Sequence, residues 1–465
     1  MNSLQKNIYY KGLLTFSNYV LGFITFPYIT RVLGPENFGL VNFSMNTVDY
    51  FLLFATMGIT TIGTREIAGC KNNRDKLDIT YSQVLGINGL FTFITLLIYF
   101  ICLIIVPKFS AASELLYIGS AKILFTLFAV EWLFTGLEEF RYITIRSLII
   151  KIIYVIVVFV CVKDKTDYLL YFILTIGVVV VNSLVNFGYA SKLVSVQINQ
   201  LRSIRFLKQN MRLGGYAIMT SMYITFNVMY LGLVSSNEEV GYYSAAVKLY
   251  FIAISLFGAF TSVMLPRISS LVVIEDKVGI QRYMDISFRM VMLMAIPIIL
   301  IGMIFAPEII YILSGNGYDA SILPMRIIMP AIILVWSALV MVYLGLIPLH
   351  RDDILLKAAI VGGLLAIALN IVLTPRLGSI GSALVLLICE MCVTLFYIIR
   401  IKRSNLFKLP QCSVILKALY QSFPYIGICF FARFYFDNFT GLFVALLGCG
   451  IYFLYQNPIK QIRAV

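Results

Sequence analysis

Long apolar runs, separated by short polar segments, follow one another along almost the whole chain. They do not alternate with period two, as the strands of a membrane barrel would, and each is close to the about 20 residues that a membrane-spanning helix needs. We therefore predict an all-α membrane protein with about fourteen transmembrane helices. The expected spans are residues 12–31, 40–63, 84–106, 114–135, 143–162, 168–187, 213–234, 241–264, 288–306, 323–346, 356–374, 380–399, 412–432 and 439–455.

Composition and charge agree with this pattern and orient it. The chain is 60% hydrophobic and 12% charged, about half the charge of a soluble domain. With the N-terminus inside, most of the 36 basic residues fall in cytoplasmic segments, so the positive-inside rule predicts that both termini are cytoplasmic. This bias accounts for most of the net charge of +14. Because that charge is spread over short loops, no nucleic-acid partner is expected.

Several positions recur at a nearly constant separation. Glu36 and Gly39 are spaced like Glu238 and Gly241, 202 residues later. The two tryptophans, Trp132 and Trp336, are 204 residues apart. Such internal symmetry is typical of transporters. We predict that residues 1–200 and 201–404 are two pseudo-symmetric six-helix bundles, and that residues 405–465 form an appended helix pair.

Polar side chains form a stripe on the second expected span. Asn42, Asn46 and Asp49 are spaced i, i+4 and i+7, so they share one helix face. A carboxylate at membrane depth is costly and usually faces a wet cavity. Lys248 is equivalent to Asn46 at the 202-residue offset. We favour a shared central cavity, and the alternative is hydrogen bonding between helices with no ligand.

The ionisable residues at membrane depth are the candidate chemistry. Four of the six are basic, which suits an anionic cargo such as a phosphate or a diphosphate. We assign substrate binding to the basic four and Asn46, and proton or Na⁺ coupling to the two acids. The basic residues are Arg31, Lys122, Lys248 and Arg326, and the acids are Asp49 and Glu390.

Two further expectations concern the cytoplasmic side. Arg146 and Lys151, near the start of the fifth span, are expected to extend to the membrane surface. The longest polar connection, residues 188–212, carries apolar side chains at helical spacing with basic residues between them. It is predicted to be an amphipathic helix on the cytoplasmic leaflet, joining the two halves.

Motifs of enzyme chemistry are missing from the sequence. It contains no Walker A motif, dinucleotide fingerprint, zinc-ligand spacing or nucleophile elbow. The loops are too short to hold a catalytic domain. We therefore expect no enzymatic activity, no cofactor and no metal.

The sequence also resembles a known family over its whole length, most specifically in the first 150 residues. It is similar to the bacterial polysaccharide flippases, the O-antigen or capsule repeat-unit (Wzx-type) transporters of the multidrug/oligosaccharidyl-lipid/polysaccharide exporter superfamily. The residues that carry the resemblance are Lys6-Asn7, Pro27-Tyr28, the run from Arg31 to Glu36 with Gly39, Glu131-Trp132, Gly136 to Glu139, and Tyr142 to Arg146.

The resemblance implies a fold, a cargo and a location. The two bundles would face each other in a V, in the bacterial cytoplasmic (inner) membrane. The cargo would be an undecaprenyl-diphosphate-linked oligosaccharide that moves from the cytoplasmic to the outer leaflet. Arg31, Lys122, Lys248 and Arg326 would meet its diphosphate and sugars. Membrane lipids, a polysaccharide polymerase and other assembly proteins would be partners.

Three other functions stay open. A multidrug cation antiporter would have the same fold, but it should prefer an acidic and aromatic cavity. A lipid II flippase would differ in cargo alone. A membrane-embedded polymerase or glycosyltransferase would need a larger loop with catalytic carboxylates.

Overall fold

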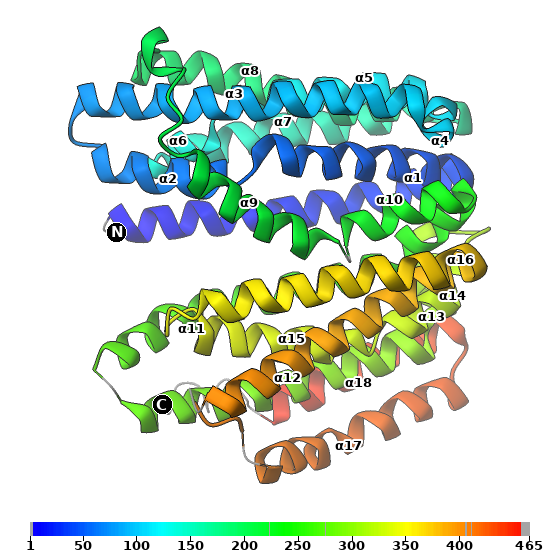
Figure 1. The fold of residues 1–465 in the computed structure, drawn as a ribbon. Helices are drawn as coiled ribbons and strands as arrows, with labels where there is room; N and C mark the ends of the chain where they lie inside the picture. Colours follow the sequence, from blue (N-terminus) through cyan, green and yellow to red (C-terminus); the bar gives the residue numbers. More distant parts are fainter. Residues whose placement is uncertain (1–2, 223, 275, 405–406, 411, 457–465) are drawn as a thin grey trace. The chain divides into compact units, whose positions relative to one another are not determined.

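The computed structural model describes residues 3–222, 224–274, 276–404, 407–410 and 412–456, and within this part the chain is helical and contains no strand (Figure 1). The all-α expectation is confirmed. Side chains in several of the first twenty residues, Lys6 and Asn7 among them, lie outside the described part. The chain divides into two compact units, Met1–Gly241 and Tyr242–Val465. Each unit is described by itself below.

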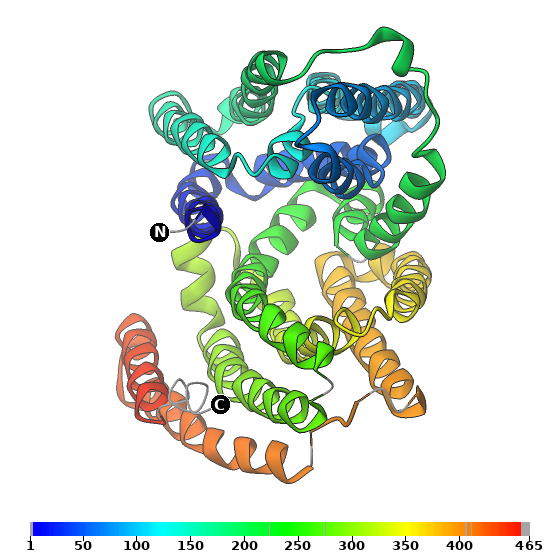
Figure 2. The ribbon, with the colours of Figure 1, turned by 90° about the vertical axis from the view of Figure 1, so that its left-hand side faces the viewer.

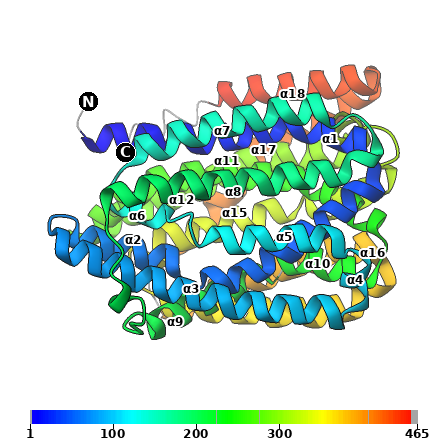
Figure 3. The same ribbon diagram turned by 90° about the horizontal axis from the view of Figure 1, so that it is seen from above.

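In the first unit, long helices run beside one another (Figures 1 and 3). Helix α1 packs against α3, α5, α7 and α10, and α5 packs against α8. The helices are α1 (Ser3–Thr56), α2 (Ile59–Cys70), α3 (Arg74–Ile105), α4 (Pro107–Ala111), α5 (Ser113–Thr126), α6 (Glu131–Gly136), α7 (Phe140–Cys161), α8 (Tyr168–Leu193), α9 (Leu207–Ser221) and α10 (Thr225–Val234), with the short helices η1 (Lys165–Asp167) and η2 (Ile198–Gln200).

The second unit is a further bundle, seen end-on in Figure 2. Helix α17 packs against α12 and α18, so the C-terminal helix pair is attached to this unit. The helices are α11 (Asn237–Val273), which begins in the first unit, α12 (Lys277–Ile304), α13 (Ala306–Ser314), η3 (Asp319–Ser321), α14 (Ile322–Ile328), α15 (Ala331–Met341), the π-helix η4 (Val342–Leu346), α16 (Asp352–Ser404), α17 (Cys412–Tyr435) and α18 (Asn438–Tyr455).

The structure confirms a multi-pass membrane architecture without confirming fourteen spans. Among the described residues, ten helical segments are long and apolar enough to cross a membrane. They become eleven if α9 and α10, bent by 56° relative to each other, form one broken span. Helix α1 covers two of the expected spans but is not among the ten segments. Helix α16 also covers two expected spans, yet it counts as one of the ten segments.

Both of these long helices are interrupted at a glycine. Gly34 has φ of 72° and Gly378 has φ of 55°, a left-handed conformation that side chains with a Cβ rarely adopt. Pro35 follows Gly34 and has no N–H to continue the hydrogen-bonding pattern. The first break lies inside the Leu33-Gly34-Pro35 segment of the repeated motif, so the motif marks a turn between two helical segments.

The two tryptophans, predicted to be equivalent from their 204-residue separation, are both buried, each within its own unit. Trp132 is 4% exposed, lies 5.5 Å from Tyr81 between ring centroids, and fills the space that a Cβ at Gly63 on α2 would need. Trp336 is fully buried and stacks on Phe257 of α11 at 4.6 Å. The two indoles therefore pack on different elements, Trp132 on α2 and α3 and Trp336 on α11.

The repeated glycines meet within the first unit. A Cβ at Gly39 would overlap the carbonyl oxygen of Asn237, and a Cβ at Gly241 would overlap that of Pro35. Asn237 lies 202 residues after Pro35, as Gly241 lies 202 residues after Gly39, so the two contacts are reciprocal at this offset. Only glycine allows the two backbones to approach this closely. We call these four residues the glycine seam.

The connection at residues 188–212 differs from its prediction. Helix α8 continues to Leu193, residues 194–197 are non-helical, η2 is a single short turn, and regular helix resumes at Leu207. Side chains of α3 hold the connection in place: Asp78 accepts a bond from the Ser195 N–H at 2.9 Å, and the Ser82 hydroxyl accepts one from the Gln197 N–H at 2.8 Å. These side-chain acceptors satisfy backbone donors that a helix would satisfy itself, so the predicted amphipathic helix is wrong here.

Candidate functional site

The polar stripe lies on the second segment of α1, where its two amides bond to their own helix. Asn42 Nδ2 donates to the Phe38 carbonyl at 2.7 Å, and Asn46 Nδ2 donates to the Asn42 carbonyl at 2.8 Å. Both side chains are half-buried. The predicted substrate role of Asn46 stays a prediction, with its amide group held along the helix.

The carboxylate of the same stripe is paired. Asp49 Oδ1 lies 2.5 Å from Lys122 Nζ on α5, and the ammonium also lies 3.4 Å from Met45 Sδ. The Lys122 side chain is 15% exposed and that of Asp49 is 38% exposed. The structure therefore joins a residue predicted to bind substrate with one predicted to bind the coupling ion.

The local sequence of α5 explains how Lys122 reaches α1. Gly119 lies one turn before Lys122, and a Cβ there would overlap Cγ2 of Val48. Val48 is the neighbour of Asp49 in the chain. A glycine at this position lets the two helices approach closely beside the ion pair.

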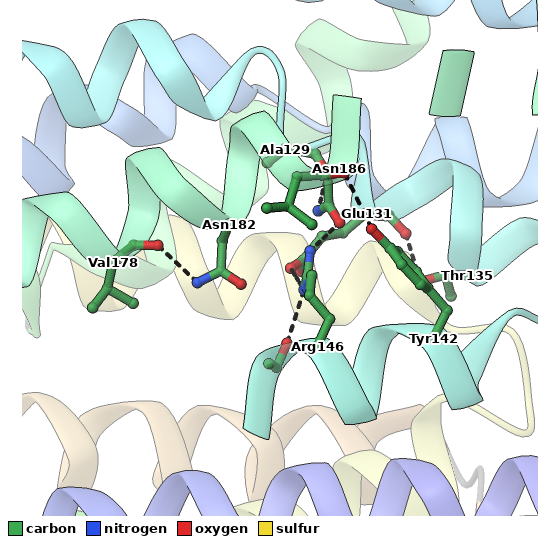
Figure 4. A network of polar contacts seen from close by, with 10 residues as sticks. Ala129, Glu131, Thr135, Tyr142, Arg146, Val178, Asn182 and Asn186 are labelled. Carbon is green, nitrogen blue, oxygen red and sulfur yellow. Dashed lines mark hydrogen bonds and ion pairs between the residues drawn. The ribbon is translucent and has the colours of Figure 1, made fainter. Parts of the chain in front are cut away.

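A second charged cluster in the first unit was not predicted. Arg146, expected at the membrane surface, is only 7% exposed. Its guanidinium donates to Ser147 Oγ at 2.8 Å, to Glu131 Oε1 at 3.2 Å, and to Asn186 Oδ1 (Figure 4). The sequence signal was an asparagine, Asn186, inside the apolar run of α8. Its side chain gives the arginine a partner that allows burial.

This cluster stabilises a break between α5 and α6. Helix α5 ends at Thr126, and α6 begins at Glu131. Between them, Val130 has φ of 39°, which is unusual for a β-branched residue. Asn186 Nδ2 donates to the Ala129 carbonyl at 2.5 Å, next to the break (Figure 4). Inside a membrane, such a carbonyl must find a partner within the protein. Breaks of this kind are common at transporter binding sites.

Arg31 and Arg326 are exposed, and each bonds to a carbonyl in its own unit. Arg31 Nη1 donates to the Pro27 carbonyl at 3.3 Å, within its own helix. Arg326 Nε donates to the Met303 carbonyl at 3.0 Å, in the last turn of α12. A cation at a helix C-terminus is favourable because of the helix dipole. Their roles in substrate binding stay predictions.

In the second unit, Lys248 lies on α11 and Glu390 lies on α16. Glu390 on α16 is 7% exposed and accepts a bond from the Tyr250 hydroxyl at 3.2 Å. Lys248 is half-buried on α11, two residues before Tyr250. Residues two apart do not share a helix face, so the contact with Glu390 lies on a different side of α11 from Lys248.

One further ion pair was missed from the sequence. Glu308 on α13 is 3% exposed at its side chain and lies 2.5 Å from Arg433 on α17. Arg433 also donates to Asn438 Oδ1 at 3.2 Å. This pair ties the appended helix pair to the rest of its unit. It could not be inferred from spacing because its members are 125 residues apart.

Comparisons with known proteins give the site its context. A family model described as "Polysaccharide biosynthesis protein" matches residues 4–272. The "Putative O-antigen transporter" of Escherichia coli strain K12 is 27% identical over 410 residues, which are 87% of this chain and 98% of that protein.

Solved structures share the fold. "Lipid II flippase MurJ, inward closed conformation" superposes with a TM-score of 0.78 at 16% identity, covering 98% of this chain and 100% of that one. An inward-facing "multidrug resistance MATE family transporter of the MOP superfamily" superposes with a TM-score of 0.62 at 12% identity, covering 84% and 95%. These two neighbours are transporters by name, and at this identity they show the fold alone. Because the family model covers more than half of the chain, the protein belongs to the polysaccharide biosynthesis protein family, as the resemblance to the bacterial polysaccharide flippases led us to expect.

Proposed function

We propose that the protein is a flippase that moves undecaprenyl-diphosphate-linked oligosaccharide repeat units from the cytoplasmic to the outer leaflet for surface polysaccharide synthesis. The observation that carries this proposal is the family membership, together with similarity to a putative O-antigen transporter over 98% of that protein's length. No step of this function requires the chain to form or break a covalent bond, so it is not an enzyme in this proposal.

The basic residues supply the recognition of the diphosphate. Ammonium and guanidinium groups form short, charge-assisted bonds with phosphate oxygens. Lys122 is the best placed in the first unit, because its ammonium lies at membrane depth and already holds one carboxylate oxygen. Lys248 supplies a second ammonium group, from α11 in the second unit. Arg31, Arg326 and Asn46 contact the remaining phosphate and sugar groups.

Transport follows alternating access of the two repeats, residues 1–200 and 201–404. The head group enters a basic central cavity from the cytoplasm while the lipid tail stays in the bilayer. The membrane potential, negative inside, favours outward movement of an anion by about 2.3 kcal/mol per charge per 100 mV. Asp49 or Glu390 binds a proton or Na⁺ as a further driving force.

The proposed setting is the bacterial cytoplasmic membrane, with both termini inside, as the distribution of basic residues predicts. Membrane lipids surround the protein. A polysaccharide polymerase and other assembly proteins receive the cargo on the outer side.

The test is transport in sealed proteoliposomes that contain only this protein and a lipid-diphosphate oligosaccharide. We expect the sugar to become accessible in the opposite leaflet, and Lys248→Ala to abolish this movement without preventing membrane insertion. Lys357→Ala is the matched control, since Lys357 is exposed near the start of α16, 4.0 Å from Asp353. Normal transport by Lys248→Ala would refute the role of Lys248.

The same vesicles separate the other functions. Movement of lipid II in preference to lipid-linked oligosaccharides would assign the sister cargo. Movement of cationic dyes, with no oligosaccharide moved, would assign a drug antiporter.

A further inference from the structure

We infer that Asp49 is an internal counter-ion that the anionic head group of the substrate displaces from Lys122. This inference rests on the proposed function and adds a competition step to it. In the unloaded protein, Asp49 Oδ1 takes the position beside Lys122 Nζ that a phosphate oxygen takes after binding.

The geometry of the pair supports an exchange of this kind. The two atoms are 2.5 Å apart, so the ammonium is in full contact with an oxygen anion. The Lys122 side chain is mostly buried, whereas 38% of the Asp49 side chain is exposed. We therefore expect the Asp49 carboxylate to move away from the contact when a substrate binds, and the Lys122 ammonium to keep its position.

The hydrogen bonds around the pair also support displacement of the Asp49 carboxylate. Among the described residues, Lys122 is the polar partner that the structure gives to Asp49. The Arg146–Glu131 ion pair of the same unit differs: Arg146 donates to Asn186 and Ser147 as well as to Glu131. An arginine held by three side chains keeps its position if the carboxylate is lost. Asp49 lacks such a network, so its departure breaks a single charged contact.

Charge balance explains why an internal carboxylate is useful. An unpaired ammonium at membrane depth is unfavourable, and the cost falls when an anion neutralises it. With Asp49 present, Lys122 is paired in the empty state. When a diphosphate arrives, one anion replaces another, so substrate binding and release exchange partners without leaving a bare cation.

The exchange has a kinetic consequence. A carboxylate that competes for Lys122 lowers the affinity for the substrate and helps to expel it after the protein opens on the outer side. Without the competitor, the substrate should bind more tightly and dissociate more slowly. Asp49 would thus lower the affinity for the substrate and raise the rate of its release.

The test measures binding and transport separately in the full-length protein. The binding probe is a short-chain prenyl diphosphate, titrated calorimetrically into purified protein in detergent. We expect Asp49→Asn to bind the probe about tenfold more tightly, equivalent to about 1.4 kcal/mol, and to transport the lipid-linked oligosaccharide more slowly than the wild type. Asp49→Glu keeps the carboxylate and should therefore gain less affinity than Asp49→Asn.

Two controls keep the result interpretable. Asp353→Asn removes a carboxylate that pairs with Arg351 at 2.9 Å in the first turn of α16, and it should leave the affinity unchanged. Asp49→Ser provides a second neutral variant if Asn at this position prevents folding. It should show the same gain in affinity.

Unchanged or weaker binding of the probe by folded neutral variants would overturn the inference. This result is distinct from failure of the proposed function. If wild-type protein moves the oligosaccharide but the neutral variants gain no affinity, the displacement step is wrong and the flippase stands. If wild-type protein moves no oligosaccharide, the flippase proposal is wrong.

Discussion

Lys122 Nζ lies 2.5 Å from Asp49 Oδ1, which pairs an acid of α1 with the cation of α5. The sequence placed both groups at membrane depth but gave them separate tasks. Because they neutralise each other, the free positive charge of the first unit is smaller than the residue types alone suggest. A mutation that removes either charge therefore leaves the other charge without its partner and also alters the contact between α1 and α5.

Removing the cation of this pair should destabilise the protein. Lys122→Met leaves the partly exposed Asp49 carboxylate without its partner, and we expect a loss of about 1–2 kcal/mol, less than for a fully buried pair. The melting temperature of the purified protein measures the loss.

The double variant Lys122→Met/Asp49→Asn is the control, because it removes both charges together. It should recover part of the stability that Lys122→Met loses, since the two residues are in contact and their effects are not additive. Additive losses would show that the pair contributes nothing beyond its separate side chains.

Replacement of Asn186, beside the break between α5 and α6, should destabilise the protein far more than replacement of Asn182, one turn away on α8. Asn186→Leu removes a partner of Arg146 and of the Ala129 carbonyl, leaving buried polar groups unsatisfied, and should cost about 2–4 kcal/mol. Asn182→Leu is the matched control, because the bond that the described residues give to Asn182 is a local one, to the Val178 carbonyl at 2.7 Å.

Thermal unfolding of the two variants side by side checks this prediction. We expect Asn186→Leu to lower the melting temperature and the amount of folded protein in membranes, and Asn182→Leu to change both little. Equal behaviour of the two variants would mean that the break does not depend on this clamp.

The glycine seam should reject a single methyl group. Gly39→Ala and Gly241→Ala each place a Cβ on a backbone carbonyl that cannot move aside without shifting its helix, so both should destabilise the protein. Gly89→Ala on α3 is the control, since a Cβ there meets nothing within 4 Å, and alanine favours the helix by about 1 kcal/mol. Melting temperatures that fall for the first two variants and hold or rise for the third would agree with the seam.

Loss of the Glu308–Arg433 pair should loosen the C-terminal helices. Arg433→Leu leaves the nearly buried Glu308 carboxylate unpaired, which is more costly than loss of an exposed pair. We expect faster proteolysis between α16 and α17 in membranes. Glu308→Gln/Arg433→Leu should reduce the effect, and identical digestion of wild type and Arg433→Leu would contradict it.

Helical periodicity predicted which residues share a face, but it could not predict their partners on other helices. The stripe of Asn42 and Asp49 follows from a period of 3.6 residues within one span. The contact with Lys122 also depends on Gly119, whose missing side chain sets the distance between two helices. Roles in substrate binding stay predictions for all five assigned residues.

Arg146 and the linker show where local reasoning fails. An arginine near the end of an apolar run usually extends to the surface, but an asparagine on a different helix made burial favourable here. The linker has apolar residues at helical spacing, yet side chains of α3 satisfy its backbone. In both cases a tertiary hydrogen bond outweighed the local preference.

The reciprocal contacts of the glycine seam bear on the origin of the predicted sequence repeat. Gly39 touches Asn237 while Gly241 touches Pro35, so residue i of one copy meets residue j of the other, and the converse also holds. This is the rule for an isologous two-fold interface between identical subunits. If residues 1–200 and 201–404 arose by duplication, a half-length ancestor would have carried this self-complementary surface, and gene fusion would have preserved a homodimer contact inside one chain.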